Sequence, residues 1–143
     1  MEPDAIPDAA AGGTVCAVVV NYRCAAQTIA CLESLAAAAP GTPVVVVEND
    51  SGDDSAARLE AFAEQHPGVT VLRSQRNGGF GAGCNLGIDR ALAAHAGLSN
   101  VLLVNPDTTH EPGFLDALRD CAARHPRAGI VGGLIMDGDG RHV

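Results

Sequence analysis

Short runs of apolar, mostly β-branched residues recur along the chain, at 15–20, 44–47, 69–72, 101–104 and 130–136. Continuous runs of this length are typical of strands that are buried on both faces of a sheet. Each interval between two runs is long enough for a helix that crosses from one strand to the next. The pattern therefore predicts five strands.

The intervals carry the periodicity of amphipathic helices. Helices are predicted at 25–38, at about 53–65, around 88–95 and around 114–121. Leu59 and Phe62 mark the buried face of the second of these helices. The strict alternation of strand and helix predicts an α/β fold with an open, mostly parallel sheet and right-handed crossover helices.

Composition narrows the class of ligand. The net charge is −8 and the chain has no lysine, which argues against a nucleic-acid partner. An acidic chain still binds phosphates through a helix N-terminus, a glycine-rich turn, a few arginines or a carboxylate-bound metal. The five cysteines form no CxxC pair, and we interpret them as small buried apolar residues of a protein in the reducing cytoplasm.

Polar and glycine-rich segments follow four of the predicted strands directly, at 21–23, 48–55, 73–83 and 105–108. In open parallel sheets, ligands bind beyond the carboxyl ends of the strands. The convergence of these four segments therefore predicts a binding site at that edge of the sheet.

The segment 76–83 is rich in glycine but does not match the known nucleotide fingerprints. Cys84 and Leu86 stand where GxGxxG requires its last glycine, and GxxxxGK[ST] is absent because there is no lysine. A glycine-rich turn that opens a helix still lets the backbone approach an anion closely. An ordinary flexible surface loop is the alternative interpretation.

Four carboxylates, those of Glu48, Asp50, Asp53 and Asp54, lie within seven residues. Asp53 and Asp54, with Ser55, suit the N-cap and first turn of the second predicted helix. That explanation does not extend to Glu48, which ends a buried strand at the ligand edge. We interpret Glu48 as a ligand contact.

Asp107 follows Pro106 at the end of the fourth predicted strand. Its carboxylate is a hard oxygen ligand, suited to Mg²⁺ or Mn²⁺ that bridges a diphosphate. An ordinary loop aspartate before a helix is the alternative.

Together, five segments resemble the nucleotide-binding half of family 2 glycosyltransferases, and in particular the bacterial rhamnosyltransferase-like members. They read VVVNYR, VENDSGDDS, RNGGFGAGCNLGI, LLVNPDT and IVGGLIMDGDGR, and they extend over residues 15–141. The resemblance implies the Rossmann-like half of a GT-A fold. It also implies an inverting transfer of a sugar from a nucleoside-diphosphate sugar to a glycan or lipid-linked acceptor, in cell-wall or polysaccharide biosynthesis, with Mg²⁺ or Mn²⁺ as cofactor.

The same resemblance implies site residues. The nucleotide-binding set is Asn21, Tyr22, Glu48, Arg76, Asn77, Gly78 and Asn85, and the metal ligand is Asp107 in place of the DxD-type carboxylate. Asn21 and Tyr22 would lie beside the nucleobase, and Glu48 would contact the base or ribose. Glu48 departs from the aspartate usual in the family, and Asp50 and Asp54 replace small residues of the usual pattern.

We predict a flexible acidic leader at 1–14 and a nucleotide-sugar-binding domain at 15–143. Because the family usually continues into an acceptor-binding half, the general base is expected beyond Val143; within the chain, Asp137 and Asp139 are the first residues to test. An apolar face left uncovered by that half would favour self-association. We expect a location in the cytoplasm or at the inner face of the membrane, because no apolar run approaches the ~20 residues of a membrane span.

Two other functions remain open at this point. One is a non-catalytic nucleotide-sugar-binding module that needs a partner chain. The other is a nucleotidyltransferase, although such enzymes usually carry a glycine-rich loop with Arg and Lys near the first strand, and this chain has none there.

Overall fold

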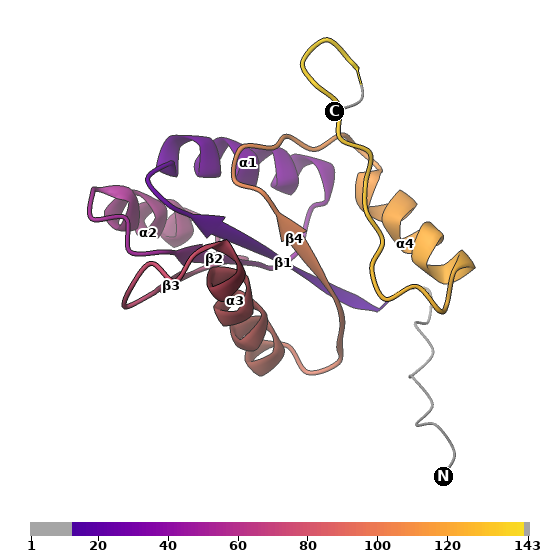
Figure 1. The fold of residues 1–143 in the computed structure, drawn as a ribbon, viewed down its shortest axis with the longest axis horizontal. Coiled ribbons are helices and arrows are strands. Elements are labelled where there is room, and N and C mark those ends of the chain that lie inside the picture. The colour runs from indigo at the N-terminus through magenta and orange to yellow at the C-terminus, as the bar shows by residue number, and fades with distance from the viewer. Residues whose placement is uncertain (1–12, 142–143) are drawn as a thin grey trace.

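The computed structural model describes residues 13–141, in which strands and helices alternate (Figure 1). The strands are β1 (Thr14–Asn21), β2 (Val44–Glu48), β3 (Val69–Arg73) and β4 (Leu98–Val104), and the helices are α1 (Ala25–Ala38), α2 (Ser55–Gln65), α3 (Phe80–Ala94) and α4 (Phe114–Arg124). The α/β fold is confirmed. β1 begins at Thr14, inside the predicted leader 1–14, and residues 1–12 of that leader lie outside the described part of the chain.

All the strands of the sheet run parallel, in the order β3-β2-β1-β4. β1 is hydrogen-bonded to β2 on one side and to β4 on the other. Helices cover both faces around it, and its side chains from Val15 onward are buried. This position explains why the β1 sequence is apolar without alternation.

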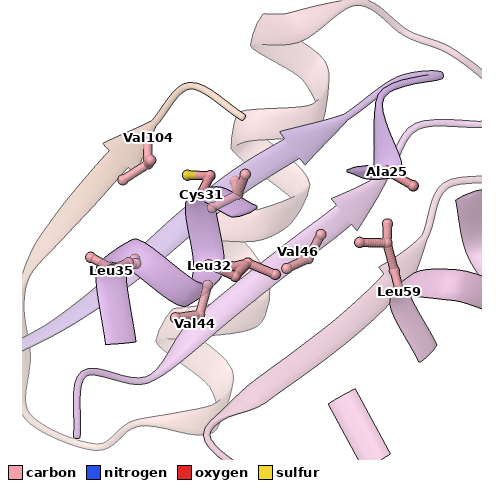
Figure 2. Close-up of a cluster of buried hydrophobic side chains, with 10 residues drawn as sticks. Ala25, Cys31, Leu32, Leu35, Val44, Val46, Leu59 and Val104 are labelled. Atoms are coloured by element: carbon pink, nitrogen blue, oxygen red, sulfur yellow. The ribbon is translucent and has the colours of Figure 1, made fainter. Parts of the chain in front are cut away.

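The helices form two outer layers: α1 and α2 lie on one face of the sheet and α3 lies on the other (Figure 1). Figure 2 shows the core under α1 and α2, where Leu32 and Leu35 of α1 and Leu59 of α2 gather with Val44 and Val46. Leu59 is fully buried, whereas Phe62 is only partly buried against this cluster. The prediction that Leu59 faces the core is therefore confirmed, whereas the Phe62 side chain is less buried than predicted.

The face of α3 against the sheet is made of small residues. Gly83, Cys84, Gly87 and Ala91 are its buried members, while Leu92 is 56% exposed. A Cβ on Gly83 would lie 2.8 Å from Val20 Cγ1, so the backbone of α3 rests directly on β1. The third predicted helix exists but begins earlier than 88–95, at Phe80; within the predicted stretch Ala91 is buried and Ile88 packs against the core, whereas Leu92 faces outward.

The predicted fifth strand at 130–136 is wrong. These residues form no strand, and Met136 makes only an isolated bridge. Ile130 is 92% exposed and Leu134 69% exposed. A strand needs a neighbour for its backbone N–H and C=O groups, and this segment joins neither edge of the sheet in the described structure.

Three cysteines, Cys16, Cys31 and Cys84, are buried as predicted, whereas Cys24 and Cys121 are only half-buried. Burial raises the pKa of the Cys16 and Cys84 thiols, so they remain protonated and behave as small apolar side chains. Within the described residues, no helix has the length and apolar character to cross a membrane.

Candidate functional site

The polar segments predicted to converge do so, because the strands that precede them are parallel neighbours. Asn21, Glu48 and Arg73, which end β1, β2 and β3, are paired in register, and Val19 of β1 is paired with Val104 at the end of β4. The four loops that follow therefore leave the sheet along one edge, here called the carboxyl edge. It is the edge at which open α/β sheets bind their ligands.

Ser51 is the centre of a buried polar network between the first two of these loops. Its backbone N–H donates to Glu48 Oε1 at 3.0 Å, and its hydroxyl donates to the same oxygen. The hydroxyl oxygen accepts from Asn21 Nδ2 at 3.4 Å, while Asn21 Oδ1 accepts from the Thr28 hydroxyl at 2.7 Å. Asn21 and Glu48 are 0% and 5% exposed, so these two predicted residues hold the loops in place from inside.

Arg23 binds the first loop to the second from the surface. Its backbone N–H donates to Ser51 Oγ and its Nε donates to the Ser51 carbonyl, both at 2.9 Å. Arg23 and Asp50 are the non-glycine residues with positive φ in the described chain, at 56° and 58°. A positive φ at a non-glycine residue is a strained conformation, which persists only where the surrounding contacts hold it. Conformations of this kind are concentrated at functional sites.

The glycine-rich turn opens α3, as predicted. Gly79 has φ +86° and ψ 174°, a conformation open to glycine and strained for other residues. Asn77 Oδ1 accepts from the Gly79 N–H at 2.9 Å and from Asn49 Nδ2 at 3.0 Å. The first turn of α3 carries no acidic side chain, so its free N–H groups and positive dipole end suit an anion.

The remaining predicted nucleotide residues lie on the surface of this edge. Tyr22 is 42% exposed, and the Arg23 guanidinium carbon lies 5.2 Å from the centre of its ring. Arg76, Asn77, Gly78 and Asn85 are also exposed. Of the predicted nucleotide residues, Asn21 and Glu48 are joined through Ser51, and Asn77 is hydrogen-bonded to Asn49. Among the described residues, no hydrogen bond links the Asn85 side chain to the other predicted nucleotide residues.

Arg73 is at the carboxyl edge but already has a partner. Its guanidinium donates two hydrogen bonds of 2.6 Å to Glu60 of α2. These bonds hold the pKa of the Glu60 carboxyl below its ordinary value. Arg23 and Arg76 are therefore the cations of this edge that have no carboxylate partner in the described structure.

Asp107 is exposed in the loop after β4. The loop is held to α1 by Cys31, whose thiol donates to the Asn105 carbonyl at 3.5 Å, and it is closed by the Thr108 hydroxyl, which donates to the same carbonyl at 2.8 Å. The described residues contain no cluster of three or more His, Cys, Asp or Glu side chains that could enclose a metal. A single carboxylate fits an ion such as Mg²⁺ that takes its other ligands from water and substrate phosphates.

A cavity of about 450 Å³ lies at the opposite edge of the sheet, lined by Thr14, Pro43 and Arg119 among others. It is formed where strands begin, away from the loops that carry the converging polar groups. We therefore place the candidate site at the carboxyl edge.

Four residues that organise this edge were not predicted from the sequence as site residues: Arg23, Thr28, Asn49 and Ser51. Asn49 lies between Glu48 and Asp50, and Ser51 directly follows Asp50, so these two polar residues stand among carboxylates that dominate the pattern. A usable signal was present, because Asn and Ser directly after a buried strand at the ligand edge commonly form hydrogen bonds to nearby backbone.

The sequence is similar to that of known glycosyltransferases. A family model described as Glycosyl transferase family 2 matches residues 16–142. A curated relative from Mycobacterium tuberculosis, N-acetylglucosaminyl-diphospho-decaprenol L-rhamnosyltransferase, is 38% identical over 104 residues, which are 68% of this chain and 34% of the relative. The chain thus spans about a third of the length of that relative.

Two solved structures are similar in fold. The mannosyltransferase PcManGT from Pyrobaculum calidifontis, in complex with GDP-Man and Mn²⁺, has a TM-score of 0.65 and 21% identity over 93% of this chain and 38% of its own. TarS of S. aureus has a TM-score of 0.61 and 20% identity over 87% of this chain and 24% of its own. The likeness in fold to the mannosyltransferase structure supports the predicted assignment to part of a GT-A fold.

Proposed function

The chain belongs to glycosyl transferase family 2, and from this membership we propose that it is the donor-binding part of an inverting glycosyltransferase. In this proposal a nucleoside-diphosphate sugar binds at the carboxyl edge. The observation that supports it most is the meeting there of the interlocked β1 and β2 loops with a glycine-rich turn that opens α3. The free amides of that helix and the guanidinium groups of Arg23 and Arg76 offer hydrogen-bond donors to phosphate oxygens, at an edge that also carries exposed aspartates.

The residues of the carboxyl edge divide into two groups by burial. We assign the exposed ones to the ligand: the Tyr22 ring packs against the nucleobase, and Arg76, Asn77, Gly78 and Asn85 line the nucleotide. The buried pair, Asn21 and Glu48, shapes the site through Ser51, and the second carboxylate oxygen of Glu48 contacts the base or ribose.

Asp107 is the proposed metal ligand, and its exposure beside the converging loops is compatible with that role. When bound, Mg²⁺ or Mn²⁺ neutralises negative charge on the departing diphosphate. Asp107 would hold this ion, and the amides of the first turn of α3 would donate to phosphate oxygens. No described residue is assigned as the general base, and Asp137 and Asp139 stay the first to test.

The acceptor and the location are inferred by analogy. The name of the mycobacterial relative describes a rhamnosyl transfer to a decaprenol-linked acceptor. We propose a glycan or lipid-linked acceptor for this chain and a peripheral position at the inner face of the membrane. The exposed apolar side chains of Leu103, Ile130, Leu134 and Ile135 support self-association as a further property, which analytical ultracentrifugation would measure.

Titration calorimetry tests the proposed function directly. UDP, dTDP and GDP are titrated into the chain with Mn²⁺, with Mg²⁺ and with EDTA. We expect saturable, metal-dependent binding of at least one diphosphate and weaker binding of the matching monophosphate, which lacks the second phosphate. An absence of binding for all three diphosphates in the folded chain would overturn the proposal.

A further inference from the structure

The side chain of Asn49 joins the end of β2 to the glycine-rich turn before α3. Its Nδ2 donates to Asn77 Oδ1 at 3.0 Å and to the Gly79 carbonyl at 3.3 Å. Its backbone N–H donates to the Asn21 carbonyl at 2.9 Å, which ties the same residue to the end of β1. Because Asn49 is only 2% exposed, three segments of the carboxyl edge meet at one buried residue.

The orientation of this amide follows from its neighbours. Asn77 Oδ1 also accepts from the Gly79 N–H, so an oxygen is required at that position. A flipped Asn49 would turn its own oxygen toward two acceptors, and a flipped Asn77 would turn its NH₂ toward the Gly79 N–H. One arrangement alone keeps all of these hydrogen bonds.

This arrangement has a cost, because Asn49 Oδ1 is buried and has no donor among the described residues. A buried acceptor without a partner destabilises a fold. Asn49 therefore commits both of its side-chain N–H groups to the turn while its oxygen stays unpaired. Support from Asn49 matters here because the N-cap residue of α3 is Gly79, which has no side chain that could cap the helix.

We infer that Asn49 is a positioning residue of the nucleotide site, an inference that rests on the proposed function. Its amide holds the turn 77–79 against the end of β2. The free N–H groups of the first turn of α3 thereby keep a fixed place beside the β1 and β2 loops. A diphosphate then meets donors that are already oriented, which raises its affinity because less order is lost on binding.

Asn49→Asp is the principal test. The substitution keeps the shape of the side chain but removes both donated hydrogen bonds and sets a carboxylate against two oxygens. Asn100→Asp is the matched control, since Asn100 is exposed on β4 and its amide donates to Ser99 Oγ at 3.2 Å. One readout is the exchange rate of the Gly83 amide, which donates to the Gly79 carbonyl at 3.1 Å and closes the first turn of α3.

We expect Gly83 amide exchange to rise at least tenfold in Asn49→Asp, while exchange at Val19 in β1 stays as in the wild type. The dissociation constants of UDP, dTDP and GDP with Mn²⁺ form the second readout, and the one that binds should weaken at least tenfold. Asn100→Asp should change neither readout. A folded Asn49→Asp variant with unchanged Gly83 exchange, or with faster exchange and unchanged nucleotide affinity, overturns the inference.

A different outcome is that the Gly83 amide exchanges faster in Asn49→Asp but the wild type binds none of the three nucleotides. This outcome refutes the proposed function, whereas the conclusion that Asn49 holds the turn 77–79 in place stands. If Asn49→Asp does not fold, Asn49→Ala is compared in the wild-type and Asn77→Ala backgrounds. If Asn49 acts through Asn77, the loss of nucleotide affinity caused by Asn49→Ala should be much smaller in the Asn77→Ala background than in the wild-type background. An equal loss in both backgrounds would contradict it.

Discussion

Gly87 of α3 lies against Val18 of β1 so closely that a Cβ on Gly87 would overlap Val18 Cγ1. A Cβ on Gly87 would also lie 3.2 Å from Val47 Cγ2 of β2. With Gly83, this contact brings the backbone of α3 onto the sheet. The helix that the glycine-rich turn opens is thereby seated beside the carboxyl edge.

Gly87→Ala should lower the free energy of unfolding by about 1–3 kcal/mol, because the added methyl overpacks a buried contact. Gly81→Ala is the matched control: it lies in the same helix, and its Cβ would meet nothing within 4 Å. That control should be neutral or slightly stabilising. Chemical denaturation measures both, and equal stability of the two variants would show that α3 does not contact the sheet at Gly87.

Leu59→Ala should lower the free energy of unfolding by about 2–5 kcal/mol, because this fully buried side chain fills the core under α2. Phe62→Ala should cost less, since Phe62 is only partly buried. Leu92→Ala, at a position 56% exposed, is the control and should change stability by less than about 1 kcal/mol. A Leu59 loss no larger than that of Leu92 in urea denaturation would mean that α2 is docked differently.

Asp107→Asn should weaken metal-dependent binding of a nucleoside diphosphate at least tenfold, or by about 1.4 kcal/mol. The amide keeps the size of the side chain but loses the charge that holds the cation. Asp120→Asn, on the exposed side of α4, makes the same charge change away from the carboxyl edge and should leave affinity intact. Calorimetry at several Mn²⁺ concentrations measures this; unchanged affinity and metal dependence in Asp107→Asn would remove Asp107 from the site.

His110 should make stability depend on pH. Its Nδ1 lies 3.0 Å from Ser34 Oγ, and burial lowers the pKa of the His110 imidazole below its ordinary value. Between the folded-state pKa and the ordinary value near 6.5, the unfolded chain binds more protons than the folded chain. The free energy of unfolding should therefore fall as the pH drops through this interval.

The measurement is urea denaturation across that pH interval for the wild type, His110→Gln and the exposed control His125→Gln. Removal of His110 should flatten the decline in stability toward low pH, because the proton that only the unfolded chain takes up is lost. Equal slopes for the wild type and His110→Gln would contradict the assignment.

The sequence by itself determined the local elements and their order. Continuous apolar runs mark strands covered on both faces, and the helical periodicity places α1 at 25–38, as observed. Because parallel strands end at one edge, the order of elements also gave the convergence of the polar loops. These features depend on near neighbours in the chain, so a pattern along the sequence carries them.

Tertiary structure decided what depends on distant neighbours. The run at 130–136 has the composition of a strand but pairs with no edge in the described structure, and pairing is what makes a strand. Gly83 belongs to the glycine-rich segment 76–83 in the sequence, and Gly87 lies just beyond it, yet in the fold the lack of a side chain at both positions is needed for contact with Val20 and Val18. Glu48 is a ligand contact in the sequence-based prediction, and only the fold shows that its carboxylate is buried and that one of its oxygens accepts hydrogen bonds from Ser51. Only the packed fold distinguishes a polar side chain that holds a loop from one that faces a ligand.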